Sequence, residues 1–223
     1  MINELIFIGY IGIVSISALL ALRLGKEALV ALICVQWVLA NLFVTKQITL
    51  MGLNATSSDA LAVGATLCLN LVQEYFGKEL AQKTILIGFC STLFYTTLSF
   101  LQVLYCPSAA DTAHAHFCAL LTPMPRIVIA SVVTYVIVQQ LDFYLFGFLK
   151  KRMPNHSLTT RNYLSVSVTQ FIDTALFTFL GLYGLVASIR DIIIVSYGVK
   201  LVILVIAAPC ITLSQYFYKP TDV

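Results

Sequence analysis

Long apolar stretches, separated from one another by short polar segments, run through the whole chain of 223 residues. A helix needs about 20 mainly apolar residues to cross the hydrocarbon core of a bilayer. Seven stretches approach or exceed that length: Ile2–Leu22, Ala28–Ile48, Ser57–Phe76, Ala81–Tyr105, Ile127–Leu149, Tyr163–Val186 and Ile192–Phe217. The pattern therefore predicts an all-α fold, a polytopic bundle of membrane helices.

The third stretch, Ser57–Phe76, is the least regular of the seven. It opens with short polar side chains of the kind found at helix N-termini, namely Asn54, Thr56, Ser57, Ser58 and Asp59. It also ends with polar Gln73 and Glu74. Two interpretations stay open, a complete span or a shorter, partly re-entrant helix.

The composition agrees with a membrane protein. Hydrophobic residues make up 60% of the chain and charged residues 10%, and the mean hydropathy is +0.94. Soluble domains average roughly 45–50% apolar and about 25% charged residues. The net charge of +3 is too small to indicate a nucleic-acid partner, and the spans leave no length for a separate soluble domain. The partner that the composition predicts is the lipid bilayer.

The distribution of Lys and Arg predicts the orientation, because these residues collect on the cytoplasmic side. If the basic loop at residues 150–154 is cytoplasmic, alternation places most other positive charges on the same side, namely Arg23, Lys26, Lys78, Lys83, Arg161 and Lys219. The longest loop, Cys106–Met124, has no Lys or Arg, as expected of an outer loop. We expect a multi-pass protein of the bacterial inner membrane, with its N-terminus outside and its C-terminus in the cytoplasm.

The same outer loop carries two cysteines and an H-x-H motif. Cys106 and Cys118 are candidates for a disulfide if the loop faces an oxidising space. His114 and His116 lie close to Asp111 and have the residue types of a metal site, but a solvated loop is the preferred interpretation. We expect no bound metal and no cofactor.

Polar side chains within the apolar stretches form the candidate binding site. A charged group in hydrocarbon costs about 2.5–3.5 kcal/mol on insertion scales, so such residues face a bundle interior or an aqueous cavity. Amides and carboxylates recur three or four residues apart, a spacing that puts them on one helix face. The candidate binding residues are Asn41, Asn70, Glu74, Arg126, Gln139, Asp142, Gln170, Asp173 and Lys200.

These residue types predict the kind of ligand. Carboxylates accept hydrogen bonds, amides accept and donate, and Lys only donates. A flat heterocycle with adjacent N–H donors and a carbonyl, such as the edge of guanine, matches this set. Four aromatic side chains are candidates for stacking on it: Tyr75, Phe76, Phe171 and Tyr197. The competing interpretation is that the polar residues only hold helices together.

No motif of a common enzyme class accompanies these residues. The chain has no P-loop, no H-E-x-x-H, no G-x-S-x-G and no C-x-x-C. The membrane acids have neither a nucleophile nor a metal cluster beside them, so acid–base catalysis is the weaker interpretation. We therefore expect a transporter, without catalytic residues.

Several stretches, in this order and spacing, resemble the queuosine precursor transporter family of the vitamin uptake transporter group. They are Asn41–Val44, Asn70–Lys83, Arg126–Gln139 with Asp142 and Phe146, Ser167–Asp173 and Tyr197–Lys200. The resemblance implies a six-helix core that imports 7-deazaguanines (preQ0, preQ1 or queuine) for making the tRNA nucleoside queuosine. It places all the candidate binding residues except Asn70 at or near the substrate cavity. Asn70 stands where relatives often have an acid.

The resemblance also suggests a division of the chain. Residues 1–26 would be an additional N-terminal transmembrane helix, and residues 27–223 the six-helix transporter core. Two modes of action stay open: a carrier that works alone, or a substrate-binding membrane subunit for another vitamin or nucleobase-like solute, driven by a separate ATPase module. The sequence also leaves open the precursor, the energy source and whether the chain forms a homodimer.

Overall fold

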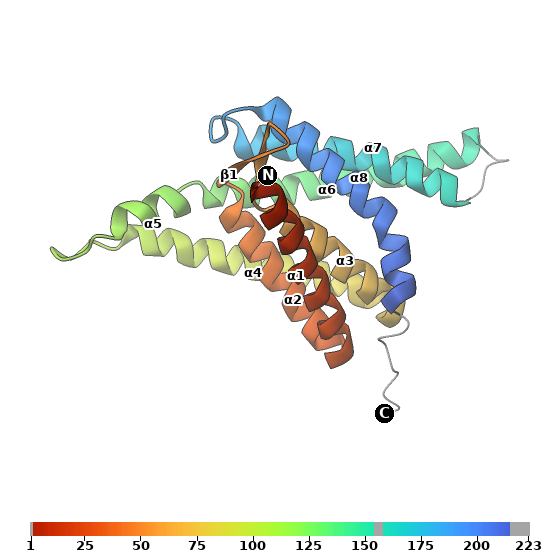
Figure 1. The fold of residues 1–223 in the computed structure, drawn as a ribbon, viewed down its shortest axis with the longest axis horizontal. Helices are drawn as coiled ribbons and strands as arrows, with labels where there is room; N and C mark the ends of the chain where they lie inside the picture. Colours follow the sequence, from red (N-terminus) through yellow and green to blue (C-terminus); the bar gives the residue numbers. More distant parts are fainter. Residues whose placement is uncertain (1, 154–157, 215–223) are drawn as a thin grey trace.

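Seven long helices make up most of the computed structural model, which describes residues 2–153 and 158–214. They are α1 (Ile2–Leu24), α2 (Lys26–Phe43), α3 (Asp59–Phe76), α4 (Lys78–Leu104), α6 (Met124–Arg152), α7 (Leu158–Phe177) and α8 (Ile189–Ser214). A short π-helical turn, η1 (Thr178–Leu182), continues α7. Figure 1 shows the helices in one bundle, from which the α4–α5 end and the far ends of α6 and α7 extend in opposite directions.

The predicted helical membrane fold is confirmed, since each expected stretch contains one long helix. Five described segments are long and apolar enough to cross a membrane: α1, α2, α4, residues 114–149 and residues 164–182. The 18-residue α3, with its polar ends, is not among them, so its complete span stays a prediction. The predicted end of the last span at Phe217 and the predicted cytoplasmic Lys219 lie outside the described residues.

The prediction was wrong about the end of the second helix. Helix α2 ends at Phe43, not at Ile48, and an antiparallel hairpin follows, β1 (Gln47–Leu50) and β2 (Leu53–Thr56). Met51 and Gly52 connect the strands with φ angles of 50° and 81°. Positive φ at both central residues is what the type I′ turn of a two-residue hairpin requires. The apolar residues of β1 had extended the helical pattern past its true end.

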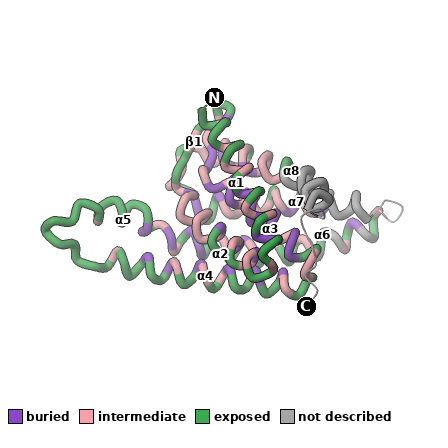
Figure 2. The backbone as a smooth tube through the Cα atoms, turned by 60° about the horizontal axis from the view of Figure 1, so that its bottom comes forward, coloured by how far each residue is buried: buried purple, intermediate pink, exposed green. Residues whose placement is uncertain are grey.

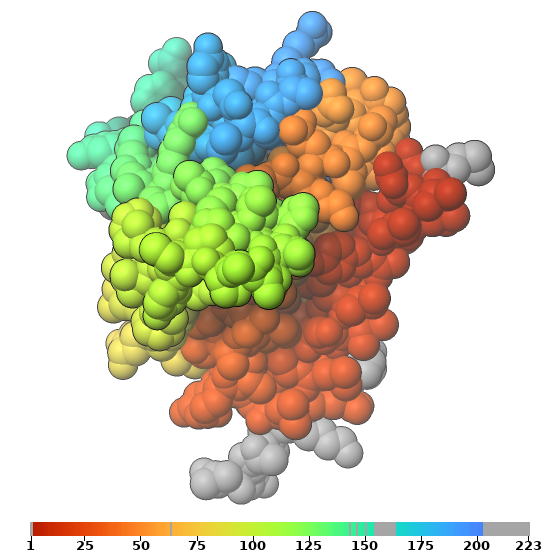
Figure 3. All heavy atoms as spheres, turned by 90° about the vertical axis from the view of Figure 1, so that its left-hand side faces the viewer, coloured from red at the N-terminus to blue at the C-terminus, as the bar shows by residue number. Residues whose placement is uncertain are grey.

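Hydrogen bonds tie this hairpin to two distant parts of the chain. The side chain of Asn3 donates to the carbonyl of Thr49 at 3.0 Å, joining the start of α1 to β1. Gln47 accepts from the amide of Ala187 at 2.8 Å and donates to the carbonyl of Leu185 at 3.4 Å. In Figure 3 the hairpin, in orange, lies between α1 and the blue segment that contains this loop. The hairpin therefore fastens α1 and the η1–α8 loop together at one end of the bundle.

The expected outer loop contains a short helix that the sequence did not predict, α5 (His114–Leu121). Cys106 and Cys118 are free thiols in the structure, and the Cys118 Sγ lies 3.4 Å from Nε2 of His114. The disulfide is therefore not formed there, and its formation in an oxidising compartment stays a prediction. Figure 2 shows that α5 and the adjoining end of α4 are mostly exposed.

Helix α4 has its large apolar side chains outside and its small, polar ones inside. Its buried residues include Gly88, Thr92 and Thr96, whereas Phe94 and Leu101 are exposed. The buried hydroxyls are satisfied within the helix, because Thr92 donates to the carbonyl of Gly88 at 2.9 Å and Thr96 to that of Thr92 at 2.8 Å. This arrangement suits a helix that presents apolar side chains to lipid and packs closely on its neighbours.

Close packing of α1 on α3 depends on Gly64. A Cβ at this position would lie 1.8 Å from Cγ1 of Val14, too close for any real contact. Ala60, one turn earlier on α3, is fully buried, so the two small residues together permit a close approach of the helices. Helix α1 thus packs directly against the rest of the bundle. The division between residues 1–26 and 27–223 remains a prediction.

We expect Gly64→Val to lower the free energy of unfolding by about 1–3 kcal/mol, the usual cost of overpacking. The valine would force α1 and α3 apart at Val14. Thermal unfolding in detergent would measure the loss. The control is Gly12→Val on α1, where an added Cβ meets nothing within 4 Å. Equal stability of the two variants would contradict the α1–α3 contact.

Candidate functional site

A cavity of about 430 Å³ lies among α2, α3, α4, α6, α7 and α8. Its volume is within the usual range for small-molecule sites, about 300–1,000 Å³. Hydroxyl, amide and charged side chains face it alongside aromatic ones. Its polar lining consists of Asn41, Thr56, Ser58, Asp59, Thr66, Thr92, Ser131, Thr134, Tyr135, Gln139, Gln170, Asp173, Thr174, Thr178, Ser196 and Lys200.

The structure brings together five of the nine predicted binding residues. They come from α2, α6, α7 and α8: Asn41, Gln139, Gln170, Asp173 and Lys200. The other four do not line this cavity: Asn70, Glu74, Arg126 and Asp142. Helical spacing correctly grouped Gln170 with Asp173, but it also grouped Gln139 with Asp142, which the structure separates.

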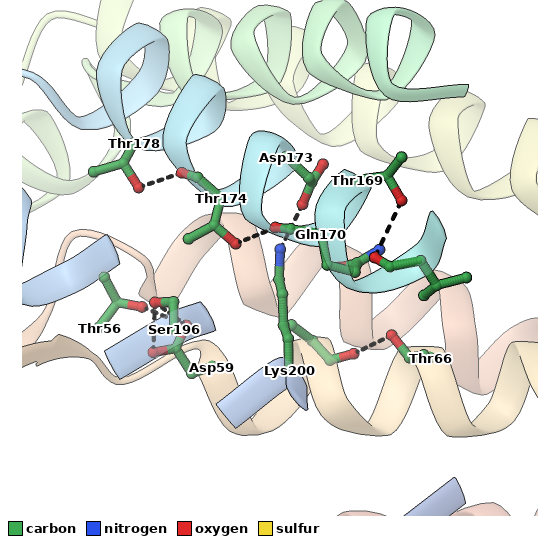
Figure 4. A network of polar contacts seen from close by, with 12 residues as sticks. Thr56, Asp59, Thr66, Thr169, Gln170, Asp173, Thr174, Thr178, Ser196 and Lys200 are labelled. Atoms are coloured by element: carbon green, nitrogen blue, oxygen red, sulfur yellow. Dashed lines mark hydrogen bonds and ion pairs between the residues drawn. The ribbon is translucent and has the colours of Figure 1, made fainter. Parts of the chain in front are cut away.

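An ion pair between α7 and α8 occupies the cavity wall. Nζ of Lys200 lies 2.5 Å from Oδ2 of Asp173, and the side chains are 23% and 29% exposed, respectively. Figure 4 shows Lys200 extending toward Asp173, with Gln170 beside them. An ammonium carries three N–H donors and a carboxylate two oxygens, so the pair keeps hydrogen-bonding capacity for a ligand.

A second carboxylate, Asp59, faces the same cavity and was not among the predicted binding residues. The sequence had assigned it to the start of a helix, and it is indeed the first residue of α3. Its carboxylate accepts from Oγ of Ser196, 2.9 Å from each oxygen, and from Oγ1 of Thr56 at 3.1 Å. One sequence signal pointed to Ser196, the hydrogen-bond partner of Asp59. Ser196 precedes Lys200 by four residues, so both side chains lie on one face of α8.

Three aromatic side chains from different helices form one wall of the cavity. The ring centroids of Trp37 and Phe89 are 5.5 Å apart, and those of Phe89 and Tyr135 are 5.0 Å apart with an edge-to-face geometry. Gly88 makes room for this wall, because a Cβ there would lie 2.2 Å from Cε3 of Trp37. Both spacings are typical of favourable aromatic pairs.

The predicted stacking residues lie elsewhere. Tyr75 and Phe76 pack against the buried cluster formed by α1, α2, α3 and the start of α4. Phe171 and Tyr197 contact each other edge to face, with centroids 5.3 Å apart. None of the four lines the cavity. The prediction used position along the chain, whereas helix rotation decides which rings face the cavity.

Two of the predicted residues outside the cavity join helices. Asp142 accepts from Oγ of Ser165 at 2.7 Å and so links α6 to α7. Arg126 donates from Nε to the carbonyl of Leu180 at 3.0 Å, within the π-helical turn. Such a turn departs from the regular hydrogen-bonding ladder, so its carbonyls are suited to an outside donor. Of the other two, Glu74 is exposed and Asn70 is partly buried on α3.

Comparison with known proteins gives one family and one relative. Residues 56–214 match the family described as "Putative vitamin uptake transporter". A protein of Bacillus subtilis (strain 168), named "Probable queuosine precursor transporter", is 29% identical over 189 residues, or 83% of this chain and 82% of that protein. No solved structure is significantly similar. The family match includes four of the five predicted residues that line the cavity, all except Asn41.

We expect Asp173→Asn and Lys200→Met each to lower the free energy of unfolding by about 1–3 kcal/mol, because each leaves a half-buried charge without its partner. The double variant should lose less than the sum, with a coupling of about 0.5–3 kcal/mol. Denaturation in detergent would measure all three. Strictly additive losses would contradict the ion pair.

Proposed function

The chain belongs to the vitamin uptake transporter family, and from this premise we propose that it imports a queuosine precursor, a 7-deazaguanine, across the bacterial inner membrane. The observation that carries the proposal is the cavity. It joins a carboxylate, an ammonium and amides to an aromatic wall within a bundle of apolar helices. The name of the Bacillus subtilis relative points to the same substrate class.

The proposed recognition follows from the donors and acceptors of each side chain. The deazaguanine presents N1–H and a 2-amino group, which the carboxylate of Asp173 accepts. Its carbonyl O6 accepts from the Lys200 ammonium or from the Gln170 amide. The flat ring system lies against Trp37, and aromatic contact of this kind adds to the hydrophobic gain of burial.

The proposed orientation places the hairpin end outside the cell. The hairpin and the η1–α8 loop share one end of the bundle through the bonds of Gln47. The basic residues Lys151 and Arg152, in the last turn of α6, belong to the opposite, cytoplasmic end in this orientation.

We expect a membrane-impermeant maleimide to label Cys106 in intact cells, because this thiol is exposed in the proposed outer loop. Labelling that appears only after prior reduction would indicate the Cys106–Cys118 disulfide. Mass spectrometry of the labelled peptide provides the measurement. The control is Cys106→Ser. Labelling that requires the membrane to be permeabilised, in reduced and unreduced samples alike, would contradict the orientation.

We expect queuine, preQ1 or preQ0 to quench the fluorescence of Trp37, because the chain has a single tryptophan and it lines the cavity. Asp173→Asn should raise the dissociation constant at least about tenfold, equivalent to about 1.4 kcal/mol. Titration of the purified protein in detergent provides the measurement, with adenine as the ligand control.

The matched variant is Asp142→Asn, which alters a membrane carboxylate that hydrogen-bonds Ser165 outside the cavity lining. Its dissociation constant should stay within about twofold of the wild type, since no direct ligand contact is lost. Equal weakening by Asp142→Asn and Asp173→Asn would contradict the assigned site. No quenching by any 7-deazaguanine, in folded protein, would contradict the proposed substrate class.

A further inference from the structure

The charges that line the cavity do not balance. Among the described residues, the carboxylates of Asp59 and Asp173 and the ammonium of Lys200 line it. Lys200 is paired with Asp173. Asp59 has hydroxyl partners and no ion pair within the described part of the chain. A carboxylate without a counterion is costly in a low-dielectric interior, and a neutral substrate such as preQ0 would not compensate its charge.

The immediate surroundings of Asp59 suit a proton better than a metal ion. Its oxygens are in direct contact with the hydroxyls of Ser196 and Thr56, at 2.9 and 3.1 Å, respectively. A metal ion would have to separate these oxygens before it could bind between them. A hydroxyl both donates and accepts and rotates to suit its partner. A proton can therefore add to the carboxylate while the heavy atoms keep their places.

The cavity also contains an unused polar group. Oγ1 of Thr134 is buried, with the residue 1% exposed, and has no hydrogen-bond partner among the described residues. Thr134 lines the same cavity as Asp59. Buried polar groups are normally satisfied, so this hydroxyl has hydrogen-bonding capacity that a polar guest, water or ligand, would use. Such a guest is also what a proton needs to reach Asp59.

Few other titratable groups face Asp59 in the described structure. Lys200 on α8, Asp173 on α7 and Tyr135 on α6 line the cavity with it. On the hairpin side, Asp191 of α8 accepts from the amide of Asn54 in β2, and Glu4 of α1 accepts from the Met51 amide at the hairpin tip. The lining residues of α2 and α4 are not titratable, namely Trp37, Ala40, Asn41, Ile85, Phe89 and Thr92.

Helix α8 connects Asp59 to the Asp173–Lys200 pair. Ser196 and Lys200 are four residues apart, so they share one face of the helix. One contacts Asp59 on α3 and the other contacts Asp173 on α7. Figure 4 shows Lys200 with the Asp59–Ser196 contact on one side and Asp173 on the other. A change of charge on Asp59 therefore acts on the helix that holds the ion pair.

We propose that Asp59, with Ser196 and Thr56, is the proton-binding site that couples transport to a proton gradient. The transport part rests on the proposed import of a 7-deazaguanine. A proton from the outer aqueous phase binds the Asp59 carboxylate and forms the neutral acid. Its release to the cytoplasmic phase restores the charge. The charged Asp59 carboxylate attracts Lys200 in competition with Asp173. The neutral acid does not compete, so Lys200 stays paired with Asp173. Protonation of Asp59 therefore changes the strength of the Asp173–Lys200 ion pair that the substrate contacts in the cavity.

The first test needs no substrate. Infrared difference spectra between acidic and alkaline buffer are recorded for the purified protein in lipid nanodiscs. We expect the carboxylic-acid carbonyl band of the wild type to contain one component that Asp59→Asn lacks and that the matched control Asp191→Asn retains. The Asp191 carboxylate likewise has a neutral hydrogen-bond partner, Asn54, but it lies outside the cavity lining. An unchanged band in Asp59→Asn overturns the proposal.

A second variant covers the case in which Asp59→Asn does not fold. Ser196→Ala keeps the carboxylate and removes one hydroxyl that donates to it. We expect its carboxylic-acid band to persist at a shifted frequency, because the carbonyl stretch responds to hydrogen bonding. A band identical to that of the wild type overturns the assignment to Asp59.

The second test measures transport in proteoliposomes with radiolabelled queuine. An inward proton gradient should accelerate uptake severalfold in the wild type. Asp59→Asn should lose this acceleration and still exchange queuine across the membrane without a gradient. Acceleration by a sodium gradient in place of a proton gradient overturns the proposal. If no 7-deazaguanine binds in the Trp37 titration, the proposed substrate fails, whereas the infrared test of Asp59 still applies.

Discussion

The ion pair between Asp173 and Lys200 constrains the arrangement of α7 and α8, and the cavity depends on it. A single charge in the membrane interior costs about 2.5–3.5 kcal/mol on insertion scales, so the two charged groups must face each other or reach water. Their contact at 2.5 Å determines which face of each helix points inward. Gln170 and Ser196, each about one turn before a member of the pair, therefore reach the cavity as well.

Small residues on α3 and α4 let these helices pack closely against their neighbours and complete the wall of the cavity. Gly64 lets α3 contact Val14 of α1, and Gly88 lets α4 accept the ring of Trp37 from α2. Lipid offers no hydrophobic driving force between helices, so close van der Waals contact has to hold them together. The same contact at Gly88 positions Trp37 for the aromatic wall. Helix packing and the lining of the cavity thus share residues.

Irregular backbone in this bundle is accompanied by specific partners. Backbone groups at membrane depth must be satisfied within the protein. In the π-helical turn after α7, the carbonyl of Leu180 accepts from Arg126. In the hairpin, β1 and β2 pair with each other, and Gln47 bonds to the η1–α8 loop. Arg126 was predicted as a binding residue, and its contact in the structure is with the backbone.

The amino-acid sequence by itself determined the membrane class and the seven long helices, because a run of about 20 apolar residues has few other stable environments. It also predicted that the charged and amide side chains within those runs would gather in the interior, which Glu74, exposed on α3, does not do. Asp173, Lys200 and Gln170 meet this expectation.

Only the tertiary structure decided which polar and aromatic side chains share the cavity. Gln139 and Asp142 lie three residues apart on α6, yet Gln139 lines the cavity and Asp142 binds Ser165 of α7. Asp59 reaches the site because α8 crosses the start of α3, and Trp37 reaches it through the space at Gly88. Helical periodicity defines faces within one helix, whereas the rotation of each helix against its neighbours depends on contacts between residues far apart in the chain.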